Sequence, residues 1–560
     1  MSSDGLRGSV AAARDRVLDP SDDTLPALTL LAVLLVGFNG LWILRRLVRL
    51  HPERVYRSAS IVAASLAHPP YLLVVLVLTL ALVAGRRELS WERLEHGRRI
   101  RVLVLVASFP VVWSLVTAEY NPYFDQAYHA DRVLLLVVYA LVWVHPGFAF
   151  LLAVLVFTVE GQFLKPFGHL STTNNKLPKQ VLVLFSSFLF FELRHVSPLD
   201  RLLKRVGLGD LYGLETDDER VFLWALVALV GASYFSASVS KLVIRWPVRE
   251  NLAYWLPFAY GRGWLWHLDP GTVQRGFELL RTANPLMTWG TVVIEGAGVA
   301  LAWRRRLLPV IVAGIVGLHL TIFAMTGILF KMWVVVLVAF VWFVRRVDDA
   351  DDRGLFTRRT AVVVTVVVLL STVVLPVSSL AWFQTNYDRT YTVEVVDAEG
   401  NVYDVGWHEM TPYALTFQQN RFSYVDRNRT LDGRRSTKEY DTYQRLLSAD
   451  EPADIERLRL EYGTVSYDPE RARTFERFLK RYFETRLCDG DATTAWSRLP
   501  SLPHKFWNRP GDERPADATY TAVRVRRETT LYTDGRLRTV DTDVVRTVSL
   551  DGTQCGDASR

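Results

Sequence analysis

Three ionisable residues lie inside long apolar stretches of this 560-residue chain: Lys241, Glu295 and His319. A charged side chain is costly in an apolar environment, so each of the three is a candidate for function. A lysine that loses the solvation of its charged form becomes a neutral base, and a carboxyl or imidazole group can accept and donate protons. Together the three residue types predict proton-transfer chemistry in an apolar setting.

Lys241 ends a small polar face. Tyr234, Ser238 and Lys241 follow one another at three- and four-residue steps, so an α-helix brings them to one side. Such a side suits the lining of a pocket better than contact with lipid. At about 1.5 Å per residue, Lys241 lies roughly 7 Å inside Trp246. The alternative is a lysine whose flexible stem carries its amine to the membrane interface beside Arg245.

The expected depths of these groups follow from the basic cluster Arg304–Arg306, which marks the inner membrane edge. At about 1.5 Å per residue, Glu295 lies about 13 Å, His319 about 20 Å and Lys241 about 23 Å from that edge. We therefore expect Lys241 and His319 to share a level, with Glu295 about one helical turn below them. Alternatively, Glu295 and His319 form a structural hydrogen-bonded pair between adjacent helices.

The composition indicates which kind of chain holds these residues. Half of the residues are hydrophobic, 22% are charged, and the mean hydropathy is +0.14. The apolar runs reach the roughly 18 residues that cross a hydrocarbon core of about 30 Å. The net charge is +7, but the basic residues mostly flank the apolar runs, and we find no nucleic-acid-binding motif. We therefore expect an integral protein of the lipid bilayer, with no nucleic acid as partner, rather than a soluble enzyme or a disordered chain.

The apolar runs predict an all-α polytopic bundle of nine to ten membrane spans. Their approximate ranges are 27–44, 59–84, 102–119, 133–158, 181–193, 221–245, 286–303, 307–329, 331–344 and 360–383. The turn-forming sequence His145-Pro146-Gly147 can split the fourth run, which is why the number is not fixed. A polar tail (1–26) precedes a transmembrane domain (27–345), and a cytoplasmic linker with a final helix follows (346–385).

The distribution of arginine and lysine predicts the orientation, because short cytoplasmic loops are basic. Three basic clusters share one side of the predicted membrane: 194–220, 304–306 and 345–359. This assignment places residues 386–560 outside the cytoplasm. The early loops 45–57 and 86–101 are both basic although one span separates them, so the N-terminal topology stays open.

Residues 386–560 are expected to form a separate, β-rich α+β domain. Alternating segments predict strands over Thr390–Val396 and Val402–Trp407, and a hairpin over 519–548 around Asp534-Gly535. Residues 453–482 have a helical pattern. Its candidate core residues are Leu458, Leu460, Phe475, Phe478 and Leu479. The only cysteines, Cys488 and Cys555, form either one disulfide or two unrelated thiols, and their wide spacing argues against a metal site.

The stretch Tyr234–Leu242, followed by Trp246, resembles the lysine-bearing segment of vitamin K-dependent γ-carboxylases and their bacterial HTTM-domain relatives. Two later stretches resemble the same family. Trp289–Trp303 is similar to its acidic span, and Gly317–Met332 is similar to its histidine span with the short re-entry into the membrane that follows. The resemblance covers about residues 25–345, chiefly the part after residue 220.

This resemblance implies an enzyme that carboxylates glutamate of an exported polypeptide, with a vitamin K-type hydroquinone such as menaquinol, O₂ and CO₂, and without a metal. In the family, a neutral lysine deprotonates the quinol, reaction with O₂ generates a strong alkoxide base, and the glutamate carbanion then adds CO₂. Lys241 would be the lysine base, and His169 and His319 would be the catalytic histidines. Four further residues would contact the quinone: Tyr234, Ser238, Trp246 and Glu295.

A second function is compatible with the same layout. The layout of a lysine-containing span followed by an external β-rich domain also resembles that of lipase maturation factors and bacterial HTTM relatives. In that interpretation the chain is a non-catalytic maturation or binding protein, residues 386–560 hold an exported client, and Lys241 has a structural role. A transporter is the weakest alternative, because we see neither an inverted repeat nor paired interrupted helices.

Overall fold

The structure is a computed structural model of the chain. It describes residues 58–118, 128–163, 176–196, 218–248, 250–303, 307–348, 357–374, 381–410, 414–420, 422–432, 435–487, 498–515 and 518–554, with a few single positions in 32–39, 200–205 and 495–496. Several predicted features lie outside these residues. They are the polar tail, the first apolar run apart from single positions, His169, Arg304–Arg306, Cys488 and Cys555.

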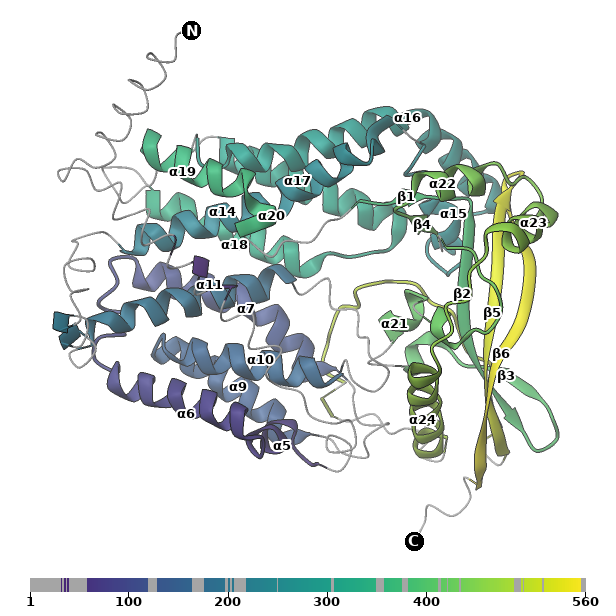
Figure 1. Ribbon diagram of the computed structural model, residues 1–560, viewed down its shortest axis with the longest axis horizontal. Coiled ribbons are helices and arrows are strands. Elements are labelled where there is room, and N and C mark those ends of the chain that lie inside the picture. The colour runs from purple at the N-terminus through teal and green to yellow at the C-terminus, as the bar shows by residue number, and fades with distance from the viewer. Residues whose placement is uncertain are drawn as a thin grey trace.

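Residues 58–374, called the helical part below, form a bundle whose helices run side by side along the long axis of the molecule (Figure 1). The main helices are α5 (Ile61–Leu66), α6 (Pro69–Ala84), α7 (Gly97–Thr117), α9 (His129–Val144), α10 (Phe148–Phe163), α11 (Lys176–Glu192), α14 (Asp218–Val243), α16 (Pro270–Gly296), α17 (Leu307–Thr326), α18 (Lys331–Asp348), α19 (Arg358–Leu369) and α20 (Ser371–Val374). Short helical turns connect some of them: η2 (Leu193–His195), η3 (Trp246–Val248), α15 (Trp255–Tyr260) and η4 (Ala297–Ala300).

Three of these helices are long and apolar enough to cross a membrane: Gly97–Thr117, Glu219–Val243 and Leu307–Thr326. Pro69–Ala84, Phe148–Gly161 and Thr360–Leu369 are apolar but shorter. The outer face of α6 exposes Leu73, Leu80 and Val83 by 58–61%, and that of α16 exposes Leu286 by 79%. Exposed apolar faces of this kind are typical of a surface that another apolar phase covers. The helical part therefore has the character of a membrane protein.

The breaks between helices follow local sequence signals. The predicted split at His145-Pro146-Gly147 is confirmed, because α9 ends at Val144 and α10 begins at Phe148. The second predicted run is also divided, since α5 ends before Ala67 and α6 begins with Pro69 at its first turn, where proline costs no hydrogen bond.

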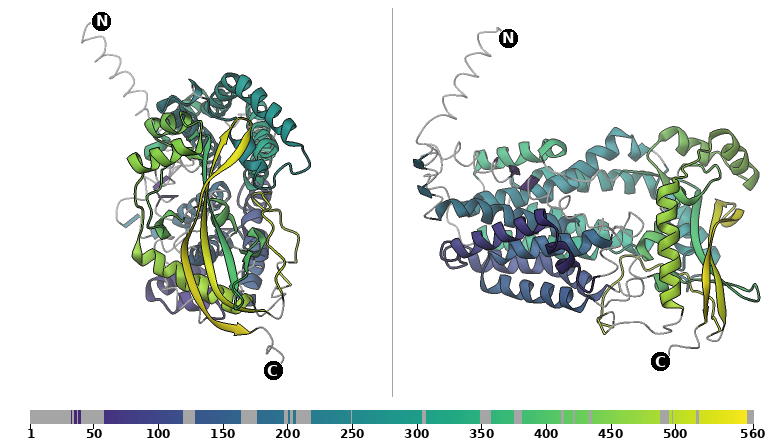
Figure 2. Two further views of the ribbon diagram at one scale, coloured as in Figure 1. Left: turned by 90° about the vertical axis from the view of Figure 1, so that its right-hand side faces the viewer. Right: turned by 60° about the horizontal axis from the view of Figure 1, so that its bottom comes forward.

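Residues 381–554, called the sheet domain, cover one end of the helical part (Figures 1 and 2). Its antiparallel sheet has the order β3 (Val402–Asp404), β2 (Tyr387–Asp397), β5 (Thr519–Thr533), β6 (Arg536–Gln554). A second, two-stranded sheet pairs β1 (Phe383–Gln384) with β4 (Ser436–Thr437). The helical elements are η5 (Trp407–Met410), α21 (Ala414–Gln418), η6 (Ser423–Val425), α22 (Tyr440–Leu447), α23 (Pro452–Tyr462) and α24 (Pro469–Arg486).

The predicted first strand and the hairpin of this domain are confirmed, including the turn Asp534-Gly535 between β5 and β6. The predicted strand Val402–Trp407 is shorter than expected, because β3 ends at Asp404 and Trp407 begins η5. The single helical segment is divided into α23 and α24 at Gly463, and Asp468 caps the second helix through the amides of Glu470 and Arg471. Phe475, Phe478 and Leu479 are fully buried, as expected. Leu460 is not a core residue: it is 70% exposed, because α23 turns the opposite face, with Ile455, towards the sheet.

One segment without regular structure, residues 498–515, joins the two parts of the molecule. The amide of Leu329 donates to the carbonyl of His504, and the amide of Phe506 donates to the carbonyl of Gly327. The indole nitrogen of Trp507 donates to the carbonyl of Thr326 at 2.7 Å. The bond from Trp507 satisfies a carbonyl that the end of α17 leaves free, and the other two hold the turn that follows this helix. The sequence pattern gave no sign of this joining segment.

Candidate functional site

The amine of Lys241 contacts the carboxylate of Glu295 inside the helical part. The Nζ–Oε2 distance is 2.5 Å, and each residue is 7% exposed. Lys241 lies in the last turn of α14, and Glu295 is the last residue but one of α16. Removal of either partner would leave the other as an uncompensated buried charge, so each residue depends on the other. The pair also joins α14 to α16.

Glycines allow α14 to approach closely the turn η4, which directly follows α16. A Cβ atom at Gly231 of α14 would lie 2.7 Å from the carbonyl oxygen of Gly298 in η4, and one at Gly298 would lie 2.8 Å from that of Gly231. Side chains of any size are excluded at such distances. Nearer the pair, Ser238 donates to the carbonyl of Val292 at 2.9 Å. The small face predicted for this helix therefore meets α16, not lipid.

Trp246 covers the Lys241 amine on the side of the sheet domain. Its ring centroid lies 5.6 Å from Nζ, within the range of a cation–π contact, and it is 4% exposed. Its indole nitrogen donates to the carbonyl of Trp382 at 2.7 Å. Asn251 donates to the Trp246 carbonyl, so the turn after α14 is fixed at both ends. The chain that enters the sheet domain thus closes the site.

His319 of α17 contacts Tyr234 of α14, two turns before Lys241. The Nε2–OH distance is 2.9 Å, and both side chains are buried. Phe330 and Trp333 surround the imidazole, with ring centroids 4.8 Å and 6.2 Å away. The histidine therefore lies in an aromatic enclosure that begins where α17 ends and α18 starts.

The structure corrects two of the alternatives considered for these residues. Lys241 does not extend to an interface beside Arg245, because its amine is buried against Glu295. Glu295 and His319 do not pair with each other: Glu295 binds Lys241, and His319 binds Tyr234. A lysine side chain is long enough to reach a carboxylate one helical turn away, so this contact is compatible with the predicted difference in depth.

Two buried polar atoms beside the Tyr234–His319 contact have no hydrogen-bond partner among the described residues. They are Nδ1 of His319 and Nε1 of Trp333. An unpartnered buried polar atom costs free energy, so such atoms in a native protein usually have a partner that is water or a ligand. These two atoms are therefore candidate hydrogen-bond partners for water or a ligand.

Sequence reasoning missed a second buried ion pair. Lys179 of α11 contacts Glu160 of α10 at 2.6 Å, and the residues are 5% and 4% exposed. Both residues lie just beyond the apolar runs 133–158 and 181–193, which is why a search inside those runs passed over them. The sequence signal for this pair was a charged residue two positions beyond the end of an apolar run.

The remaining predicted site residue, His169, lies outside the described residues. Of the residues that the structure places, Lys241, Glu295 and Trp246 form one group, Tyr234 and His319 form the adjoining group, and Ser238 is engaged with the backbone of α16. Within the described ranges, we find no group of three histidine, cysteine, aspartate or glutamate residues that could hold a metal ion.

Comparison with known proteins adds no assignment: no family model, no curated protein and no solved structure matches this chain. Any function must therefore be argued from the chemistry of the site.

Proposed function

We propose that this chain is a membrane-embedded enzyme that transfers protons to and from a lipophilic quinol in order to modify an exported polypeptide. The observation that carries the proposal is the buried Lys241–Glu295 pair, closed on one side by Trp246. A buried amine next to a carboxyl can exchange one proton with it, so the pair holds a base without keeping an isolated charge.

In this proposal the chain crosses the bilayer nine to ten times, and the sheet domain lies outside the cytoplasm. Three long apolar helices and the exposed apolar faces of α6 and α16 support a membrane location. Arg345 and Arg346 lie in the last turn of α18, and Arg358 begins α19. In Figure 1, α19 lies at the end of the bundle remote from the sheet domain. Basic residues favour the cytoplasmic side, which supports the opposite side for the sheet domain.

Each residue has a distinct part in the proposed reaction. Lys241 in its neutral form accepts a proton from the substrate hydroxyl, and Glu295 stabilises the ammonium that results. Trp246 excludes water from the amine and adds a cation–π contact once the amine is charged. Tyr234 holds His319 through its hydroxyl, which leaves Nδ1 of the imidazole available for a second hydrogen bond.

A vitamin K-type hydroquinone such as menaquinol fits the residues that are present. The unpartnered atoms of His319 and Trp333 can bind polar ring substituents, and the rings of Phe330 and Trp333 supply an apolar surface. When bound, such a quinol would supply, with O₂, the strong base that removes a γ-proton from glutamate before CO₂ is added. The proposed activity is therefore that of a γ-carboxylase-like enzyme, and no metal takes part in it.

A non-catalytic maturation or binding role is the second candidate. The favouring observation is that Lys241 is already paired with Glu295 and lies over the ring of Trp246, as a structural lysine would. In that case the sheet domain would hold the exported client, and the pair would serve only to join α14 to α16.

Intact-mass analysis of exported proteins co-expressed with this chain tests the proposal. We expect a mass gain of one CO₂ per modified glutamate with the wild-type protein and no gain with Lys241→Ala. The matched control is Lys179→Ala, which breaks a similarly buried Lys–Glu pair elsewhere in the helical part. Loss of modification in Lys241→Ala alone would support a chemical role for Lys241.

The other outcomes are also informative. A different mass change that depends on Lys241 would support Lys241 as the base and exclude carboxylation as the reaction. Full modification by Lys241→Ala would refute the enzyme proposal. Stable co-purification of an exported protein, with no mass change for either variant, would favour the maturation or binding role.

A further inference from the structure

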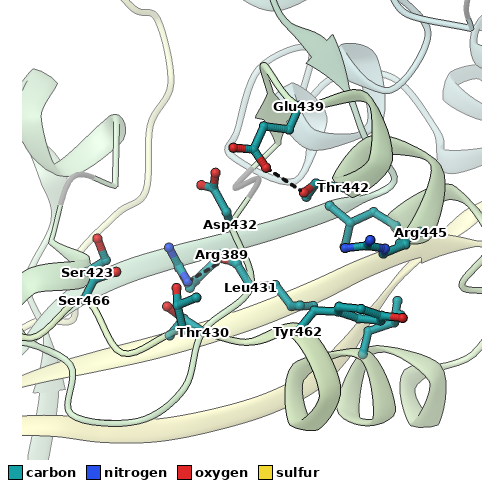
Figure 3. A pocket seen from close by; sticks show the side chains of 13 residues that line it. Arg389, Ser423, Thr430, Leu431, Asp432, Glu439, Thr442, Arg445, Tyr462 and Ser466 are labelled. Carbon is teal, nitrogen blue, oxygen red and sulfur yellow. Dashed lines mark hydrogen bonds between the residues drawn. The ribbon is translucent and has the colours of Figure 1, made fainter.

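The sheet domain contains a cavity of about 450 Å³ that shares no lining residue with the site around Lys241 and His319. It lies between β2, α22 and α23, and η6 with the loops around residues 430 and 466 completes its walls (Figure 3). This volume is in the range of pockets that take a small molecule or a short part of a larger one.

Arg389 of β2 forms the buried end of this cavity. It is 4% exposed, and its Nη1 donates to the carbonyl of Leu431 at 3.0 Å. Among the described residues, Nε has no hydrogen-bond partner, and we find no carboxylate within ion-pair distance of the guanidinium. Figure 3 shows the group lying between the hydroxyl-bearing side chains of Ser423, Thr430 and Ser466 and the side chains of α22. A buried cation without a contacting anion indicates that the anion comes from a ligand.

The guanidinium remains charged in this environment. Burial acts to lower the pKa of Arg389, but Tyr391, Tyr387 and the carboxylate of Asp426 together hold it above its ordinary value. Asp426 does not neutralise Arg389 by contact, because it is hydrogen-bonded to Arg527 at 2.7 Å. The cavity therefore has a permanent positive charge at its closed end.

The walls restrict the kind of anion that fits. Leu446 and Leu458 give the cavity an apolar side, and Tyr462 with Arg445 stacked over its ring borders the opening. The open side also has the exposed carboxylates of Asp432 and Glu439. The lining thus holds the cations Arg389 and Arg445 and the carboxylates Asp432 and Glu439, so a ligand with one negative charge suits the cavity better than one with several, such as phosphate. A single carboxylate attached to an apolar group satisfies all of these contacts.

We propose that this cavity is a binding site for a carboxylate-bearing ligand of the amino-acid class, whose carboxylate contacts Arg389 and whose apolar part contacts Leu446 and Leu458. The carboxylate can belong to a free small molecule or to a polypeptide. This inference does not depend on the reaction proposed for Lys241.

Isothermal titration of the purified full-length protein in detergent tests the proposal. The probes are N-acetyl-L-leucine, its uncharged amide, inorganic phosphate, and a peptide with capped ends and one internal glutamate. We expect the acid to bind at least about tenfold more tightly than the amide, because a charge-assisted hydrogen bond is lost in the amide. Binding by the capped peptide would identify a polypeptide side chain as a source of the carboxylate. Binding by the acid alone would identify a small molecule or a chain terminus.

Three variants locate the site. Arg389→Gln should lose the preference for the acid over the amide. Because Arg389 is buried and its replacement can impair folding, Ser466→Trp at the exposed opening provides a second test and should block all binding. Glu439→Gln removes a like charge and should tighten binding of the acid about twofold. The control is Arg457→Gln on α23, which does not line the cavity.

Equal binding of the acid and the amide, tighter binding of phosphate than of the acid, or no binding of either the acid or the capped peptide at millimolar concentration would overturn the proposal. Unchanged binding by Ser466→Trp in a folded protein would also overturn it.

Discussion

The amine of Lys241 and the carboxylate of Glu295 lie 2.5 Å apart although 54 positions separate the two residues in the chain. The contact joins the last turn of α14 to the last turn of α16. The base proposed above and the carboxylate that pairs with it therefore lie behind Trp246. The charge of the site depends on one residue from each of the two helices.

The contribution of this pair to stability can be separated from its contribution to activity. Lys241→Met leaves Glu295 as a buried carboxyl group without a partner, so we expect it to destabilise the protein by about 3–5 kcal/mol. The double variant Lys241→Met/Glu295→Leu removes both charges and should recover most of that loss. Thermal unfolding in detergent measures both. We expect the double variant to be stable and inactive, whereas recovered activity would show that the pair is structural only.

The close approach of α14 and η4 predicts opposite effects for two alanine substitutions. Gly231→Ala should destabilise the protein by about 1–3 kcal/mol, because its methyl group would lie 2.7 Å from the Gly298 carbonyl oxygen. Gly290→Ala in α16 meets no atom within 4 Å and should stabilise it by up to about 1 kcal/mol, since alanine favours a helix. Unfolding midpoints of the two variants give the comparison. Equal midpoints would mean that the helices do not touch at Gly231.

The junction between the two parts should weaken in acid through His504. Burial, with the nearby charges of Lys505 and Lys331, lowers the pKa of His504 to about 3, whereas an unfolded histidine has a pKa of about 6.5. The unfolded state then binds the proton more tightly, so stability is constant above about pH 6.5 and falls as the pH decreases towards 3. The loss is roughly 1.4 kcal/mol per pH unit within that window.

The measurement is the unfolding midpoint between pH 7.5 and 4.5 for the wild type and for His504→Asn. Asparagine can still donate to the Leu329 carbonyl that Nδ1 of His504 contacts at 3.0 Å, but it does not titrate. We expect a shallower pH dependence for the variant. The same slope for both proteins would exclude His504 as its cause.

Arg527 is the centre of an ion network in the sheet. Its guanidinium contacts the carboxylates of Asp426, Asp541 and Asp543, and the side chain is 1% exposed. Arg527→Met leaves three carboxylates facing one another, so a loss of about 3–5 kcal/mol is expected. Arg536→Met at the start of β6 is the exposed control and should change stability by less than about 0.5 kcal/mol. A small effect of Arg527→Met in chemical denaturation would show that the carboxylates repel weakly.

Much of the local structure was predictable from the sequence, because it depends on near neighbours. The break at His145-Pro146-Gly147, the hairpin at Asp534-Gly535 and the polar face that contains Tyr234, Ser238 and Lys241 each follow from a few adjacent residues. The choice of Lys241, Glu295 and His319 as buried polar groups was also correct, since polarity inside an apolar run is visible without a structure.

The partner of each buried polar side chain was not predictable in this way. The sequence allowed a Glu295–His319 pair, whereas the fold joins Glu295 to Lys241 and His319 to Tyr234. It also gave no sign of the joining segment 498–515 or of a cavity at Arg389. Lys241, Glu295 and His319 are buried because each lies within an apolar run, which the sequence shows directly. The partner of a buried charge depends on the tilt, rotation and approach of separate helices. In this protein, contacts such as that of Gly231 with Gly298 determine how the helices approach, and only the tertiary structure brings these residues together.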